Sequence, residues 1–240
     1  MPSNQRKAQP ESHPVPTADA DELADDVEQH SDEQCTITVT QSPGFLCHIS
    51  AKAQIPIPPK VLWEQCLVHP DNALIFRHME RCSYRRIVSH GPPRRVRVAH
   101  EATWRFLMFS GNFTTHLEVE EDCNALLENG KRGRVMRFEL LPQGSSIVSK
   151  FHGAWTVEDH DSDPNRSVST LDQDIAFGLW IPPPLDGILK RLSARQVRRI
   201  FQDLHAEAGR IAAGSPTLVP YNQVKDKEMG FPPPEEPVNQ

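Results

Sequence analysis

The sequence predicts an α+β domain in which a curved antiparallel sheet of about seven strands wraps around one long C-terminal helix. Three observations support this: strand-like alternation between residues 47 and 177, two short helical stretches after the first strand, and a long amphipathic stretch at 185–211. Large apolar side chains are rare before Cys35 and recur regularly from Phe45 to Ile211. These residues, about 165 in number, are enough to bury one sizeable core.

The first strand and the short helices follow from residues 47–78. Apolar side chains occupy every second position from Cys47 to Ile55, which is typical of a strand with one buried face. A proline-rich stretch at 56–59 ends this strand. Because proline suits the first turn of a helix, we expect a short helix at Lys60–Val68. A second short helix is expected at Asp71–His78.

Turn signals divide the next part of the chain into five or six further strands. Gly, Pro and Asn gather at 90–93, 110–112, 129–130 and 143–144, and a polar loop occupies 159–166. Strands separated by such regular turns indicate an antiparallel sheet.

The long helix is the clearest element. Apolar residues repeat at three- and four-residue spacing from Leu185 to Ile211, and these 27 residues would span about 40 Å. The helix is therefore long enough to cross the whole sheet. The opposite face, expected in solvent, carries Lys190, Arg191, Arg195, Arg198, Asp203 and Glu207.

Both ends of the chain are expected to lie outside the domain, which we place at 45–212. Residues 1–34 hold nine acidic and two basic side chains, and 1–44 as a whole is predicted to be a disordered acidic tail, with Cys35–Thr40 as a candidate edge strand. Six prolines make 213–240 a Pro-rich extended tail. The rest of the chain is nearly neutral, so no nucleic acid is expected as a partner.

Cysteine usage indicates the compartment. The five cysteines form no CxxC pair, which favours reduced thiols and a cytoplasmic protein. No run approaches the roughly 20 apolar residues of a membrane-spanning helix. The N-terminus also lacks the apolar stretch of a secretion signal.

The order of elements and one motif resemble a known superfamily. The stretch from Ile55 to Trp63, IPIPPKVLW, looks like the opening signature of the START, Bet v 1 and polyketide cyclase/dehydrase superfamily (SRPBCC). The resemblance covers about residues 45–212 and implies a helix-grip fold that holds lipids, sterols, quinones or polyketides. Residues 102–106, 109–111, 150–155 and 181–184 look like uncharacterised plant and algal members. This closer resemblance leaves a plastid location open.

Strand alternation and the apolar helix face give the residues expected to contact a ligand. They are Val98, His100, Ala102, Trp104, Phe106, Phe113, Thr115, Leu117, Phe138, Phe151, Trp155, Leu171, Gln173, Ile175, Leu189, Leu192 and Ile200. Small neighbours such as Ala102 and Gly153 should leave room beside the large aromatics. For any one of these residues, ordinary core packing is an equally good interpretation.

Two polar residues stand out on the inward faces. His100 and Gln173 lie among hydrophobic residues, and a buried polar group without a partner costs roughly 1–3 kcal/mol. Each therefore needs a hydrogen bond from the protein, from water or from the polar end of a ligand. Asp172 and Asp174 fall on the face opposite Gln173, so no convergent acid–base pair is visible.

The sequence favours a binding module, and no cofactor or metal is expected. No metal-ligand spacing, phosphate loop or nucleophile motif is present, and no catalytic residue is assigned. The leading hypothesis is a carrier of a hydrophobic small molecule. A cyclase or dehydratase acting on a polyketide-like substrate, and a regulatory interaction module without a ligand, are the alternatives. The long helix carries a cluster of basic side chains that could bind an anionic membrane surface or could simply be solvated on its outer face. The cluster consists of Lys190, Arg191, Arg195, Arg198 and Arg199.

Overall fold

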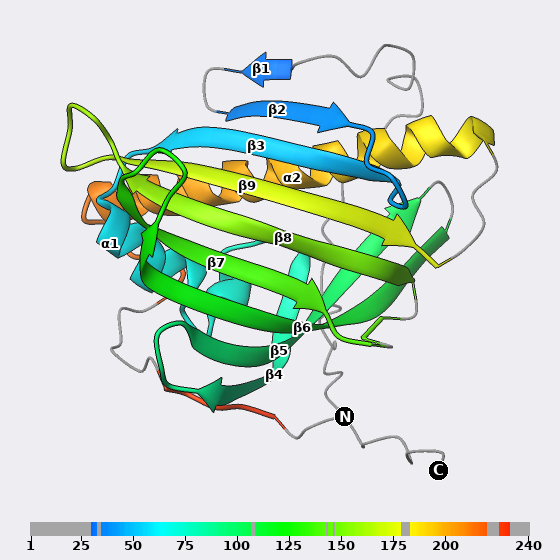
Figure 1. The fold of residues 1–240 in the computed structure, drawn as a ribbon, viewed down its shortest axis with the longest axis horizontal. Coiled ribbons are helices and arrows are strands. Elements are labelled where there is room, and N and C mark those ends of the chain that lie inside the picture. Colours follow the sequence, from blue (N-terminus) through cyan, green and yellow to red (C-terminus); the bar gives the residue numbers. More distant parts are fainter. Residues whose placement is uncertain are drawn as a thin grey trace, which may run out of the picture.

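The computed structural model describes residues 30–32, 35–106, 109–142, 144–145, 147–178, 183–219 and 226–230. Within these ranges a single sheet of nine antiparallel strands curves around the long helix α2 (Pro183–Ala212). Figure 1 shows α2 running behind the sheet, roughly along the direction of β3 and β9. The predicted α+β helix-grip architecture is confirmed.

The strand order across the sheet is β1-β2-β3-β9-β8-β7-β6-β5-β4. The strands are β1 (His30–Asp32), β2 (Cys35–Thr40), β3 (Cys47–Ile55), β4 (Met79–Ser89), β5 (Arg94–Phe106), β6 (Phe109–Leu126), β7 (Arg132–Leu140), β8 (Val148–Asp159) and β9 (Ser167–Phe177). β3 pairs with β9, from Cys47 opposite Ile175 to Ile55 opposite Ser167. This pairing places the first strand of the expected domain beside its last one.

The sheet extends upstream of residue 45, into the segment expected to be an acidic tail. β2 pairs with β3, and β1 forms a short hairpin with β2. Cys35 and Ile37 are each only 5% exposed, because one face of β2 packs against α2. The candidate edge strand at Cys35–Thr40 is therefore part of the sheet and contributes to the core.

Of the two short helices after β3, the first has about the expected length but continues as a π-helix, and the second is shorter than expected. A single turn, α1 (Pro59–Val61), runs into a π-helix, η2 (Leu62–Leu67), which the Val68 amide closes on the Trp63 carbonyl at 3.0 Å. The second helix is only the 3₁₀ turn η3 (Asn72–Leu74). It stops early because the next part of the chain bonds elsewhere: the Arg77 amide donates to Asp203 on α2 at 2.9 Å.

The core is densest against the C-terminal half of α2. Val197, Phe201, Leu204 and Ala208 are at most 1% exposed, whereas the apolar residues of the first three turns stay partly exposed. Trp155 on β8 packs on the Phe201 ring with centroids 5.7 Å apart. The interior is therefore tightly filled at one end of the helix.

The prediction that Asp203 and Glu207 lie on a solvent-facing side of the helix is wrong. Asp203 is 4% exposed and Glu207 is fully buried. Asp203 accepts hydrogen bonds from the amide and the Nε of Arg77. Glu207 accepts from the Leu218 amide at 2.9 Å and from Arg210 Nε at 2.8 Å. These donors replace water, so the carboxylates can be buried.

Part of the expected C-terminal tail packs on the domain. Val219 is fully buried, and its carbonyl accepts a bond from Gln65 Nε2 at 3.3 Å. Residues 226–230 lie along the free edge of β4, where the Arg85 and Met229 backbones exchange hydrogen bonds of 2.9 and 3.0 Å. We call residues 226–230 the edge segment. It covers an edge that would otherwise present unpaired backbone groups.

Candidate functional site

The strand registers gather the predicted inward residues on the concave face of the sheet. Val98 lies opposite Leu117, which lies opposite Leu140, and His100 lies opposite Thr115. On the other half of the sheet Phe151 lies opposite Ile175, and Gln173 opposite Gly153. These rows face the side of the sheet that α2 covers, so the candidate site is the interior between sheet and helix.

One end of this interior is closed by packing, and we call it the packed end. Trp155 and Leu171 are 6% and 2% exposed. Trp155 Nε1 donates to Ser169 Oγ at 2.6 Å, and its ring packs between Phe76 and Phe201. Every polar and apolar part of this side chain is therefore engaged with protein, and Trp155 acts as a core residue.

The other end retains uncovered apolar surface, and we call it the accessible end. Partial exposure is shared by His100, Ala102, Phe113, Phe151, Ile175, Leu189, Leu192 and Ile200. Most of these residues lie near the β5–β6 turn, the end of β9 and the start of α2. The charges of Lys190 and Asp186 influence the pKa of the Cys47 thiol, and α2 contacts β3. The first turns of α2 therefore lie over this end of β3 and β9.

The remaining predicted residues are more enclosed. Val98, Thr115, Leu117, Phe138 and Gln173 are buried on the concave face. The backbones of Trp104 and Phe106 belong to β5, with Trp104 opposite Gly111 and Phe106 opposite Phe109. Their side chains lie outside the described residues. A separate hollow of about 350 Å³ is lined by Glu101, Asn112, Phe113, Thr114, His116, Gly144 and Ser145. Most of its strand residues alternate with the inward ones, so it lies toward the convex side of the sheet and outside the candidate site.

The expectation that Gly153 leaves room beside Trp155 is wrong. A Cβ atom at this position would lie 2.7 Å from Cζ of Phe138 and would collide with the Asp172 carbonyl. The Phe138 ring, which also packs on Phe151 at 5.1 Å, fills the space. Gly153 is therefore required for close packing of β7 and β9 against β8, and it adds no volume for a ligand.

His100 and Gln173 are polar groups in this interior, but they lie far apart. Burial first, and then electrostatic interactions with Arg85 and His78, lower the pKa of His100 to about 4, so the imidazole is neutral at neutral pH. Gln173 is 9% exposed, and its side-chain amide has no hydrogen bond to any described residue. Four strand spacings separate them, about 19 Å along the curved sheet. They therefore contact different parts of any ligand.

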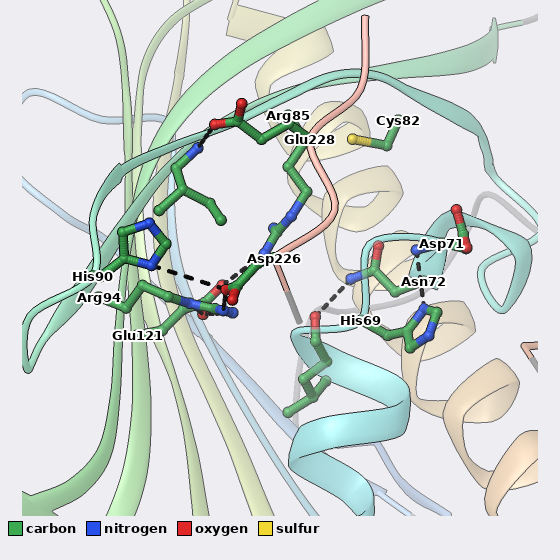
Figure 2. A network of polar contacts seen from close by, with 12 residues as sticks. His69, Asp71, Asn72, Cys82, Arg85, His90, Arg94, Glu121, Asp226 and Glu228 are labelled. Atoms are coloured by element: carbon green, nitrogen blue, oxygen red, sulfur yellow. Dashed lines mark hydrogen bonds and ion pairs between the residues drawn. The ribbon is translucent and has the colours of Figure 1, made fainter. Parts of the chain in front are cut away.

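A group of charged side chains near the β4 edge was not predicted. Arg85 on β4, Arg94 on β5 and Glu121 on β6 point to the concave side, and Arg85 and Glu121 are 5% and 7% exposed. Arg94 Nε donates to Glu121 Oε2 at 2.6 Å, and Arg94 Nη2 makes a second contact. Figure 2 shows Arg94 between Glu121 and Asp226 of the edge segment.

The basic residues of α2 form a less exposed surface than expected. Arg199 is exposed, whereas Lys190, Arg191, Arg195 and Arg198 are partly covered, and Lys190 pairs with Asp186 at 2.8 Å. Across the described ranges, no helix combines the length and the apolar character that crossing a membrane requires.

On the convex face, Asp172 and Asp174 approach His48 at 3.9 and 3.3 Å, on the side away from Gln173 as expected.

Solved structures with the same fold include lipid transfer proteins. The STAR-related lipid transfer protein fragment from Xanthomonas axonopodis is similar with a TM-score of 0.52 and 12% identity, over 76% of this chain and 98% of that chain. Human StAR-related lipid transfer protein 5 has a TM-score of 0.51 and 9% identity, over 80% and 91%. Human STARD10 has a TM-score of 0.51 and 6% identity, over 81% and 78%. At these identities the similarity establishes a START-like fold.

The search of curated proteins returned no match. The family comparison is more informative, because its matched region begins in β2, ends in β9 and so spans the whole sheet except β1. Since the model of the family described as "Domain of unknown function DUF220" matches residues 36–174, more than half of the sequence, the chain belongs to this family.

Proposed function

We propose that the protein binds a hydrophobic small molecule, such as a lipid, sterol or quinone, between the sheet and the first turns of α2. One observation carries the proposal: partly exposed apolar side chains gather at the accessible end, although the packed end of the same interior is fully closed. A ligand that buries about 300 Å² of hydrocarbon there would gain roughly 7 kcal/mol, at about 25 cal/mol per Å² and before the costs of association.

Carriage of this ligand between membranes is the second part of the proposal. The accessible end lies at the start of α2, close to Lys190 and Arg191, and Arg199 lies exposed further along the helix. Basic side chains attract an anionic bilayer surface, which would bring the accessible end to the lipid. The cytoplasm suits the chain because Cys47 and Cys66 are buried free thiols, and burial raises the pKa of Cys66 to about 12.

A cyclase or dehydratase activity has weaker support. Burial, together with the basic side chains of Arg85 and His78, lowers the pKa of His100 and leaves it a neutral imidazole. The inward carboxylate of Glu121 is held by Arg94. The geometry therefore suits orientation of a ligand better than proton transfer.

Two variants of neighbouring residues on β5 test the site. Ala102→Trp places a large ring on the concave face, whereas Thr103→Trp places the same ring on the convex, exposed face. Titration with the neutral fluorescent probe N-phenyl-1-naphthylamine should show at least tenfold weaker binding for Ala102→Trp and unchanged binding for Thr103→Trp. Circular dichroism checks that both variants fold. No uptake by the native protein, or equal losses in both variants, would contradict the proposal.

A further inference from the structure

Arg85 is a buried guanidinium whose donors are not satisfied. Its side chain is 5% exposed, and its Nε and Nη2 atoms have no hydrogen-bond acceptor among the described residues. The nearest anionic atom, Glu121 Oε1, is 3.8 Å from Nη2, which is too far for a hydrogen bond. Burial lowers the pKa of Arg85, although the group stays charged at neutral pH. A buried guanidinium with two unmet donors is costly, so the site favours a further anion as acceptor.

Neighbouring charges do not supply that anion. Glu121 is engaged by Arg94 through two guanidinium nitrogens. Asp226 contacts Arg94 at 3.5 Å and is 68% exposed, so water screens most of its charge. Within the enclosed part of the group, two guanidinium ions face one carboxylate. Among the described residues, one positive charge is therefore left in excess on the concave face.

The guanidinium lies beside the interior in which the ligand is proposed to bind. Arg85 lies opposite Val98, and Cys82 lies opposite His100, on the paired strands β4 and β5. The charge of Arg85 acts on the His100 imidazole, which keeps part of its surface uncovered. A neutral imidazole can donate one hydrogen bond and accept another. An anionic group reaching Arg85 from the His100 side would therefore meet two polar partners.

We propose that the ligand is an amphipathic acid whose carboxylate pairs with Arg85 and contacts His100, while its hydrocarbon lies along the accessible end. This inference rests on the proposed function and names the chemical class of the ligand. The single uncompensated charge matches a carboxylate, since a phosphate monoester carries about −1.5 to −2 at neutral pH. A planar carboxylate also fits the fork of a guanidinium through two parallel hydrogen bonds.

The test compares two ligands with the same chain. Palmitate and hexadecanol share sixteen carbons and differ in the head group, and each displaces N-phenyl-1-naphthylamine from the full-length protein if it binds. The native protein should bind palmitate at least tenfold more tightly than hexadecanol. Arg85→Met should remove this preference. Arg86→Met, at the adjacent exposed position facing the other side of β4, should keep it.

The outcomes separate this inference from the proposed function. Equal affinities for acid and alcohol in the native protein, or a preference that survives Arg85→Met, would overturn the carboxylate assignment while leaving hydrophobic binding intact. Binding of neither ligand and no uptake of the neutral probe would overturn both. The acid-to-alcohol ratio of the native protein decides the question even if Arg85→Met does not fold.

Discussion

Two carboxylates on α2 are buried because backbone and guanidinium donors are brought to them from other parts of the chain. Asp203 accepts hydrogen bonds from the backbone amide and the Nε of Arg77, in the segment just before β4. Glu207 accepts one from the amide of Leu218, in the segment after α2. A hydrogen bond to a charged group contributes about 1.5–3 kcal/mol. Each carboxylate therefore fixes one connecting segment onto the helix.

Replacement of Asp203 should show the size of this effect. Asp203→Ala leaves the Arg77 amide without its acceptor, and we expect a loss of about 2–3 kcal/mol in the free energy of unfolding, measured by urea denaturation. Gln202→Ala, at the adjacent exposed position, should change it by less than about 0.5 kcal/mol. Equal effects of both variants would show that the carboxylate does not anchor the segment.

His100 and His78 should make stability dependent on pH. Burial lowers the pKa of both side chains from 6.5 to about 4. Between pH 6.5 and about pH 4 the unfolded chain takes up protons that the folded chain does not, so the free energy of unfolding falls as the pH drops below 6.5. Above pH 6.5 both states are neutral, and these groups add no slope.

A single substitution isolates the part due to His100. His100→Gln should reduce the stability lost between pH 7 and pH 4.5 by about 2 kcal/mol, measured by urea denaturation at each pH. His90→Gln, at a side chain 72% exposed, should leave that loss unchanged. A pH profile of the His100 variant that matches the native one would rule out the lowered pKa of His100.

Residue positions could be predicted where strand alternation is unbroken. The inward parity of Val96 and Val98 extends to Arg94, and that of Leu117 and Val119 extends to Glu121, so the sequence could have located two members of the charged group. Arg85 could not be located in this way. Register shifts between Met79 and Arg81, Cys82 and Tyr84, and Ile87 and Ser89 break the alternation of β4.

At the scale of elements, the β4 edge and the edge segment form one unit. Besides the Arg85–Met229 pair, the Ile87 amide donates to Glu228 Oε1 at 2.9 Å, and Lys227 Nζ lies 2.6 Å from Asp71 Oδ1. Figure 2 shows Asp226 and Glu228 of the edge segment beside the β4 edge. Gly230 ends it with φ of +73°, and a Cβ there would collide with the Ser83 carbonyl. Only glycine fits this position.

Gly230→Ala should therefore release the edge segment. We expect amide hydrogen exchange at Arg85 and Ile87 to become about tenfold faster, because both amides lose their acceptors. Gly214→Ala is the matched control: φ is +64°, but no atom lies within 4 Å of the added Cβ. Its backbone strain is similar and its effect on the β4 amides should be absent. Accelerated exchange in both variants would indicate strain alone.

Helices and strands could be predicted where the pattern that forms them lies within their own segment, and not where tertiary contacts decide. The periodicity of α2 and the alternation of β3 act within each segment, and both were placed to within two residues. The second short helix was shortened by a tertiary bond, from the Arg77 amide to Asp203, that no local pattern encodes. Docking of residues 226–230 depends likewise on β4, which lies far away in the sequence.

At the scale of the whole molecule, packing differs between the two ends of the interior. Phe201 and Leu204 are fully buried beneath the sheet, whereas Leu189 and Leu192, three turns earlier on α2, remain partly exposed. The same helix thus joins a rigid core to a less densely packed region. Such a gradient lets one part of a fold open locally while the rest stays folded.

Hydrogen exchange along α2 should report this gradient and its response to a ligand. In the free protein the amides of Leu189 and Leu192 should exchange faster than those of Phe201 and Leu204, because fewer buried contacts hold them.

Saturation with N-phenyl-1-naphthylamine at 100 times its Kd stabilises the folded state by about 2.7 kcal/mol. It should slow exchange at Leu189 and Leu192 by at least tenfold, since the probe fills the space beneath them. Exchange at Phe201 and Leu204 should slow only to the extent that global unfolding becomes rarer, and Ala102→Trp should abolish the local effect. Equal amide exchange rates at Leu189, Leu192, Phe201 and Leu204 in the free protein would contradict a binding site under the first turns of α2.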